Sequence, residues 1–154
     1  MAEPKFVPRP GQVDYTDIRY APVINACIFN EGKLLLVQRS HGMRNYPGLW
    51  HCIGGFLDDK QSIEEKVVEE LVEEAGITPD RILSMQRAAP VIREDEAYGK
   101  TWITVPVRVE VTGREFTLNW EAEDAKWIDP ATAGDFELMP DFEEVLAEMM
   151  PGRA

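Results

Sequence analysis

Four glutamates lie close together in a segment that has helical periodicity. They are Glu69, Glu70, Glu73 and Glu74. On a helix, Glu70 meets Glu73 and Glu74 at the i+3 and i+4 spacings, where like charges repel one another. Negative charge near a helix C-terminus also opposes the helix dipole, by about 0.3–1 kcal/mol per exposed group. Charge alone favours a solvated acidic face over a cation site.

Carboxylates at this spacing also have the ligand chemistry of Mg²⁺. This ion takes oxygen ligands in octahedral geometry and retains several waters, so two or three carboxylates one turn apart and a diphosphate are sufficient to hold it. We therefore interpret Glu70, Glu73 and Glu74 as candidate ligands for Mg²⁺ or Mn²⁺. A divalent cation would invert the local sign of the field and let an acidic protein bind a phosphorylated substrate.

The helix that positions these carboxylates is expected from about Ser62 to Ala75. Ser62 can cap its start, with Glu65 three residues later to complete a capping box, and Gly76 can take the left-handed conformation that ends it. Its apolar residues recur at helical spacing and predict one buried stripe. They are Ile63, Val67, Val68, Leu71 and Ala75.

Strands are expected on both sides of this helix. Residues Ala21–Phe29 and Leu34–Arg39 predict a hairpin, and Leu49–Ile53 predicts a short strand that enters Gly54 and Gly55. The remaining strands are predicted at Ile82–Ile92, Thr101–Val111, Glu115–Leu118 and Ala125–Ile128, and a closing amphipathic helix at Phe142–Met150.

The spacing between Gly55 and the glutamates resembles the signature of the Nudix hydrolase family. That signature runs Gly, five residues, Glu, seven residues, Arg-Glu-aliphatic-any-Glu-Glu-any-Gly-aliphatic, and seven of its nine constrained positions match. The matches are Gly55, Glu70, Leu71, Glu73, Glu74, Gly76 and Ile77. The resemblance covers about residues 20–150, with Pro47-Gly48-Leu49-Trp50 and Trp127-Ile128 as flanking features. It implies an α/β (α+β) fold, a Nudix-type α/β/α sandwich with a mixed β-sheet. Because the first residues are rich in proline and poor in large apolar side chains, we expect an extended segment (1–19) before a single domain (20–154).

The resemblance also implies roles for individual residues. Glu73 and Glu74 bind metal, the backbone carbonyl of Gly55 adds a ligand, and Glu70 binds metal or orients the attacking water; Glu70 and Glu73 are the catalytic candidates. The implied reaction is hydrolysis of the pyrophosphate bond in a nucleoside diphosphate linked to another group, such as a nucleotide sugar or ADP-ribose. Two further candidates for substrate binding are Arg39, as a phosphate partner, and Trp50, as a face for the base. For Arg39 a surface ion pair is an equal alternative, and for Trp50 core packing is the safer assumption.

Two positions depart from the signature. Gln61 stands where a Glu is usual and keeps its length and an acceptor oxygen, whereas Glu69 replaces the Arg that steadies a neighbouring carboxylate. Lys66, one turn before Glu70, can substitute for that Arg in part. The alternative to an enzyme is therefore a weak or inactive Nudix domain that binds a nucleotide or a protein. A related isomerase is disfavoured because Cys52 is misplaced for that chemistry.

Three residues outside the signature are further site candidates, each with a structural role as the alternative. Glu121 and Asp124 precede Trp127, where the family often places another acidic residue that faces the metal, although a polar turn is the commoner explanation. His51 lies on an expected strand, and a lone histidine of that kind is more often structural than catalytic.

The composition limits the class of partner. The chain has 154 residues, enough for one domain, and its 28 Asp and Glu against 16 Lys and Arg give a formal charge of -12, which disfavours a nucleic-acid polymer as a partner. Cys27 and Cys52 lie in apolar runs without zinc-ligand spacing, so we expect reduced core residues. With no apolar run as long as a membrane span, the sequence predicts a cytoplasmic protein; monomer and homodimer both stay open.

Overall fold

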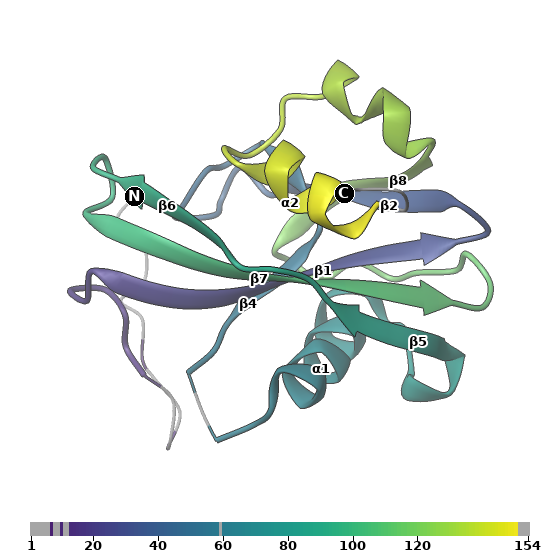
Figure 1. The fold of residues 1–154 in the computed structure, drawn as a ribbon, viewed down its shortest axis with the longest axis horizontal. Coiled ribbons are helices and arrows are strands. Elements are labelled where there is room, and N and C mark those ends of the chain that lie inside the picture. Colours follow the sequence, from purple (N-terminus) through teal and green to yellow (C-terminus); the bar gives the residue numbers. More distant parts are fainter. Residues whose placement is uncertain (1–6, 8–9, 11–12, 59, 151–154) are drawn as a thin grey trace.

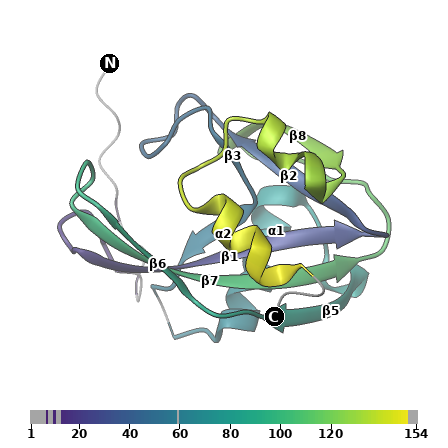
Figure 2. The ribbon, with the colours of Figure 1, turned by 45° about the horizontal axis from the view of Figure 1, so that its top comes forward.

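A mixed eight-stranded sheet forms the middle layer of the molecule, with α1 (Ile63–Ala75) on one face and α2 (Phe142–Met149) on the other (Figures 1 and 2). The structure is a computed structural model and describes residues 7, 10, 13–58 and 60–150. Its strands are β1 (Tyr20–Asn30), β2 (Lys33–Arg39), β3 (Trp50–His51), β4 (Ile53–Phe56), β5 (Ile82–Arg87), β6 (Val91–Asp95), β7 (Lys100–Val111) and β8 (Ala122–Ile128). Two short 3-10 helices, η1 (Pro79–Arg81) and η2 (Pro130–Asp135), complete the elements. The predicted α/β/α sandwich is confirmed.

Strands β1 and β7 run parallel at the centre of the sheet, and the other pairings are antiparallel. One edge of β1 is shared, because β4 pairs with residues 23–26 and β2 pairs only at Phe29 and Asn30. Strand β2 leaves β1 at that point and pairs with β3 and β8 instead. The expected hairpin is therefore present but short, and β4 takes the place beside β1 next to α1.

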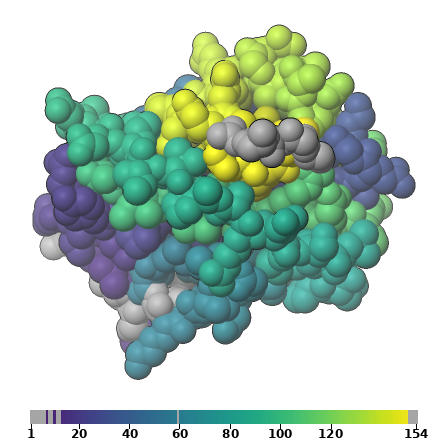
Figure 3. Space-filling view, in the orientation of Figure 1, coloured from purple at the N-terminus to yellow at the C-terminus, as the bar shows by residue number. Residues whose placement is uncertain are grey.

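Alternate residues of the central strands supply two separate apolar cores. On β1, Ile24, Ala26 and Ile28 pack toward α1, whereas Cys27 and Phe29 pack toward α2. This is the period-two alternation of a strand that is covered on both faces. In the space-filling view, α2 (yellow) and the segment before it (lime) cover the upper part of their face (Figure 3). Both cysteines are buried and free, as predicted.

The sequence prediction failed in two segments. Residues Ile82–Ile92 were expected as one strand, but the structure has β5 and β6 with a break between them, opposite Pro106 on β7. Pro90 and Pro106 both lack the N–H that a continuous ladder requires. The strand expected at Glu115–Leu118 is absent, because the Thr117 N–H donates to the Ala75 carbonyl at the end of α1 (2.8 Å) instead of to a strand neighbour.

Residues 13–19 form neither helix nor strand, and they lie against the end of β4. The Tyr15 ring stacks on Phe56 with a centroid distance of 5.1 Å, and its hydroxyl donates to the Leu57 carbonyl at 2.8 Å. The Val13 N–H donates to the Asp58 carbonyl at 3.2 Å. Apart from residues 7 and 10, the first twelve residues of the predicted extended segment (1–19) lie outside the described residues. No helix in the described part of the chain is long and apolar enough to cross a bilayer.

Candidate active site

Helix α1 begins and ends where the sequence predicted. The Ser62 Oγ accepts a hydrogen bond from the Glu65 N–H (3.1 Å), and Gly76, with φ of 64°, donates its N–H to the Val72 carbonyl (3.1 Å). A second buried stripe runs beside the apolar one and consists of Lys66, Glu70 and Glu74, at successive i+4 positions. The helix thus inserts an ammonium and two carboxylates between itself and the sheet.

Glu70 and Glu74 meet a third carboxylate, Glu121, which lies just before β8. Glu70 is 9% exposed and Glu74 is 8% exposed, and the carboxyl group of Glu74 lies within hydrogen-bonding reach of those of both Glu70 and Glu121. Burial, followed by the proximity of the two other carboxylates, raises the pKa of Glu74 well above its ordinary range. Burial also raises the pKa of Glu70 and of Glu121.

One oxygen of Glu74, Oε2, is buried and has no hydrogen-bond donor among the residues that the structure describes. The reason is chemical: carboxylates only accept hydrogen bonds unless one of them carries a proton, so Glu70 and Glu121 cannot satisfy it in their ionised forms. A proton shared between the carboxylates, or a bound cation, would satisfy this oxygen. Among the described residues, no three His, Cys, Asp or Glu side chains are already grouped as ligands of one ion.

Gly55 supplies the backbone surface on which Glu70 rests. Strand β4 holds Gly55 opposite Ile24 of β1, and a Cβ built on Gly55 would lie only 2.9 Å from Glu70 Cδ. Any larger residue there would displace the carboxylate, so the glycine is required for close approach and not for an unusual backbone angle. Glycine and glutamate of the signature therefore meet in space.

Lys66 contacts the same carboxylate from the helix side. Its Nζ lies 3.4 Å from Glu70 Oε1, 3.4 Å from Glu69 Oε2 and 3.6 Å from Asp58 Oδ1. Lys66 is 3% exposed and Asp58 is 5% exposed. Sequence reasoning considered Lys66 only as a partial substitute and missed Asp58, whose signal is weak because one acidic residue in a loop is ordinary.

Comparison with known proteins agrees with this geometry. The NUDIX domain family model matches residues 19–151. The chain belongs to the Nudix hydrolase family. Members of this family act on nucleoside diphosphate derivatives or triphosphates, and they generally use divalent metal ions. The chain is therefore a hydrolase of this family.

Three similar proteins illustrate the range of the family. Nucleoside triphosphatase NudI of Escherichia fergusonii is 25% identical over 131 residues, which cover 79% of this chain and 90% of that protein. The MutT protein of Methanosarcina mazei has a TM-score of 0.72 and 26% identity, covering 84% of this chain and 92% of that one. The Nudix domain of Shewanella oneidensis NrtR, solved with ADP ribose, has a TM-score of 0.69 and 23% identity, covering 82% and 84%.

The structure separates the four glutamates in the second half of α1 into two pairs. Glu70 and Glu74 are buried against the sheet, whereas Glu73 is exposed and Glu69 is only partly buried beside Lys66. The distinction follows from helical geometry, since residues four apart share a face. Glu121, which sequence reasoning ranked below a polar turn, joins the buried pair.

Arg39 lies next to these carboxylates at the end of β2. Its Nε donates to the Asn45 carbonyl (2.8 Å), and Glu121 and Glu74 are near enough to act on its charge. Burial lowers the pKa of Arg39, and the two carboxylates oppose that shift. Trp50, by contrast, is 9% exposed and packs in the α2-side core, where its ring lies 5.0 Å from that of Phe136.

Two loops that the sequence could not place in space meet beside Arg39. The rings of Tyr46 and Tyr98 are 4.8 Å apart, and the Tyr98 hydroxyl accepts the Tyr46 N–H at 3.2 Å. Asp95 is 7% exposed and accepts hydrogen bonds from the Tyr46 hydroxyl, from Trp102 Nε1 (3.1 Å) and from Arg93 (3.3 Å). This network fixes the loop before β3 on the β6–β7 hairpin.

The other weighed candidates have structural positions. His51 is 8% exposed, and burial, followed by the charge of Arg39, lowers its pKa to about 3, so it is neutral at physiological pH. Asp124 Oδ1 accepts the N–H of the next residue, Ala125, at 2.8 Å.

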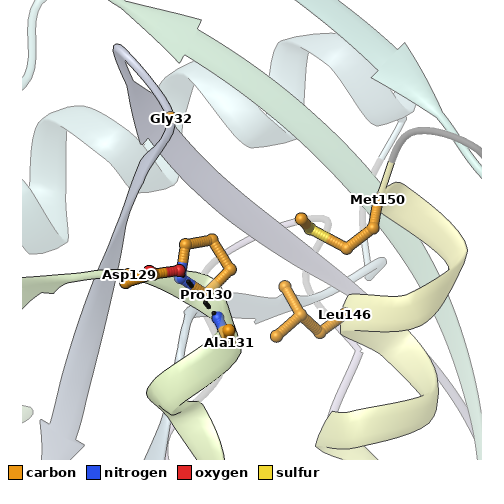
Figure 4. Close-up of a pocket in the computed structure, with 6 residues that line it drawn as sticks. All are labelled: Gly32, Asp129, Pro130, Ala131, Leu146 and Met150. Carbon is orange, nitrogen blue, oxygen red and sulfur yellow. Dashed lines mark hydrogen bonds between the residues drawn. The ribbon is translucent and has the colours of Figure 1, made fainter.

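A separate pocket lies on the α2 face, opposite α1 (Figure 4). It is lined by Gly32, Asp129, Pro130, Ala131, Leu146 and Met150. The hydrogen bond drawn across it is from the Ala131 N–H to Asp129 Oδ1 (3.0 Å) and caps η2. The buried carboxylates of α1 do not line this pocket.

Proposed function

We propose that this Nudix hydrolase uses Mg²⁺ or Mn²⁺ to cleave the pyrophosphate bond of a nucleoside diphosphate linked to a further group. The observation that carries the proposal is Glu74: its carboxyl group lies beside those of Glu70 and Glu121, and its buried Oε2 has no hydrogen-bond donor among the described residues. Such an arrangement is costly in an empty core and favourable around a divalent cation.

The residues proposed to hold the ion are Glu70, Glu73 and Glu74 and the backbone carbonyl of Gly55. The buried oxygen of Glu74 and the close approach of Glu70 to Gly55 support the assignment, and Glu121 is a further acidic group within reach. Glu73, which is exposed, would join from the solvent side. When bound, the ion would neutralise phosphoryl oxygens and activate a water.

Glu70 and Glu73 are the proposed catalytic residues. Glu70, packed on Gly55 and contacted by Lys66, has the fixed orientation that a group positioning a water requires. Arg39 is proposed to pair with a substrate phosphate, because its guanidinium adjoins the carboxylates that hold the ion. Trp50 was proposed to stack with the base; its burial against Phe136 instead supports a packing role.

The proposed substrate is a nucleotide sugar, ADP-ribose or a similar compound. The Nudix domain of NrtR was solved with ADP ribose, which supports this class. Nucleoside triphosphates are a second candidate, because the relative NudI is a nucleoside triphosphatase that aligns over most of both chains. The formal charge of -12 supports a small substrate over RNA or DNA, and two free buried thiols are in keeping with the reducing cytoplasm.

A substrate screen tests the proposal. Purified protein is incubated with ADP-ribose, nucleotide sugars, dinucleoside polyphosphates, NADH, nucleoside triphosphates and a short 5′-triphosphorylated RNA, each with Mg²⁺, Mn²⁺ or EDTA. Expected is metal-dependent turnover of a small substrate, lost in Glu74→Gln. If the products are a nucleoside monophosphate and a phosphorylated second group, the substrate is a nucleoside diphosphate derivative. If pyrophosphate is released, the substrate is a triphosphate. Binding without turnover of any compound would support the rival function, a nucleotide-binding module.

A further inference from the structure

Lys66 is the most deeply buried charged group among the described residues of α1. Only 3% of it is exposed, and a lysine that is buried to this degree is rare unless its ammonium is paired. Among the described residues, three carboxylates lie within 3.6 Å of Nζ, from Asp58, Glu69 and Glu70. Two of the three come from the same helix and one from the segment after β4.

The Glu70 carboxylate also packs closely against the sheet. The backbone of Gly55 is so near that a Cβ on this residue would lie 2.9 Å from Glu70 Cδ. Lys66 Nζ is 3.4 Å from Glu70 Oε1 on the helix side. The Glu70 carboxylate is thus held between a strand and a cation.

Asp58 contacts the same ammonium from the segment after β4. Its side chain is 4% exposed, and its Oδ1, at 3.6 Å from Lys66 Nζ, has no hydrogen-bond donor within the described part of the chain. The carbonyl of Asp58 also accepts the Val13 N–H, so the segment after β4 is fixed at this point. Lys66 therefore connects this segment to the carboxylate that faces Gly55.

We propose that Lys66, held by Asp58, is the positioning residue for Glu70, and supplies from one turn earlier in the helix the cation that the Nudix signature places at position 69. This inference rests on the proposed function and names the residue that keeps its site in order. It explains why Glu69 need not disable the site: the negative charge of Glu69 is itself paired with Lys66 at 3.4 Å. The departure and its compensation lie one turn apart.

Four variants test the positioning role. Lys66→Met removes the charge at nearly constant length, and Lys66→Arg retains it. Lys66→Met/Glu69→Arg restores a cation at the signature position. Lys33→Met, an exposed lysine at the start of β2, is the matched control.

Three readouts are compared for each variant: steady-state kinetics on the best substrate of the screen, Mn²⁺ binding, and the Gly55 amide resonance of the metal-free protein. In Lys66→Met we expect kcat to fall by about tenfold to a hundredfold with a smaller change in KM, because Glu70 loses its orientation. We also expect weaker Mn²⁺ binding and a shifted Gly55 resonance. Lys66→Arg and the double variant should recover most of the loss, and Lys33→Met should match the parent.

Two results would overturn the proposal. One is a Lys66→Met protein with a lower melting temperature but parental kcat, Mn²⁺ affinity and Gly55 resonance, since Lys66 would then only stabilise the fold. The other is failure of both cationic variants to recover function. If the parent turns over no substrate, the proposed function fails, and the Gly55 resonance still decides whether Lys66 positions Glu70.

Discussion

Replacing Glu74 by glutamine is expected to stabilise the metal-free protein at neutral pH. The parent buries Oε2 of Glu74 among acceptors, whereas the amide of glutamine can donate to Glu70 or Glu121 without any proton uptake. A buried polar atom without a partner costs about 1–3 kcal/mol, so the free energy of unfolding should rise by a similar amount. For a domain of this length, that corresponds to an increase in melting temperature of roughly 2–12 °C.

The pH dependence of this effect has a definite sign. The pKa of Glu74 is raised above its ordinary value of 4.5 in the folded protein. The unfolded chain therefore loses its proton first, and the parent loses stability as the pH rises from 4.5 toward the folded pKa. Glutamine does not titrate, so the advantage of Glu74→Gln should be small below pH 4.5 and should grow at higher pH.

Thermal unfolding in EDTA at pH 4.5 and pH 7.5 measures the effect, and Glu73→Gln is the control. Glu73→Gln removes the same charge at an adjacent, exposed position, so its melting temperature should rise little. Added Mg²⁺ should stabilise the parent, by about 2.7 kcal/mol at a hundred times the dissociation constant, and Glu74→Gln much less. The reasoning is refuted if Glu74→Gln melts at or below the parent in EDTA at pH 7.5, or if both variants gain equally.

Three further predictions concern single residues. Glu69→Arg should change kcat/KM by less than about threefold, roughly 0.7 kcal/mol, because Lys66 already contacts Glu70; a tenfold rise would show that Glu70 lacks a cation in the parent. The pKa of His51 is lowered from 6.5 to about 3, so the free energy of unfolding of the parent should decrease as the pH falls below 6.5. In urea unfolding at pH 5, His51→Gln should remove roughly 2 kcal/mol of that decrease. Equal pH slopes for variant and parent would contradict this. Asp95→Asn should lower the free energy of unfolding by roughly 1.5–3 kcal/mol in the same assay at pH 7.5, because a buried charged acceptor of three donors is lost; a change under about 0.5 kcal/mol would be evidence against that network.

The helix of the site was determined by local sequence. Its cap at Ser62, its end at Gly76 and its apolar stripe all depend on residues within one or two turns of each other. The structure has the cap and the end as predicted, and it has the stripe except for Val68, which is half-buried and lies outside the core. The same holds for β7, whose strand was predicted at Thr101–Val111 and whose Val107 and Val109 enter the α1-side core. The resemblance to the Nudix signature linked Gly55 with Glu70, and the two residues meet in space.

Strand boundaries depended on partners that lie far away in the sequence. The break between β5 and β6 follows from Pro106 on the opposing strand as much as from Pro90 within the segment. Residues 115–118 have strand-like composition, but the free carbonyl at the end of α1 takes the Thr117 N–H. A strand is completed only by its neighbour, so its own residues do not decide whether it forms.

Tertiary structure decided which charged groups meet at the candidate site. The sequence records that Glu70, Glu73 and Glu74 are neighbours on one helix, but only packing against β4 buries two of them and leaves Glu73 in solvent. Packing also brings Glu121 next to Glu74, and it buries the ammonium of Lys66, a residue type that usually lies on the surface. The physical reason is that spacing along a chain is a local property, whereas the cost of burying a charge depends on every element packed against it.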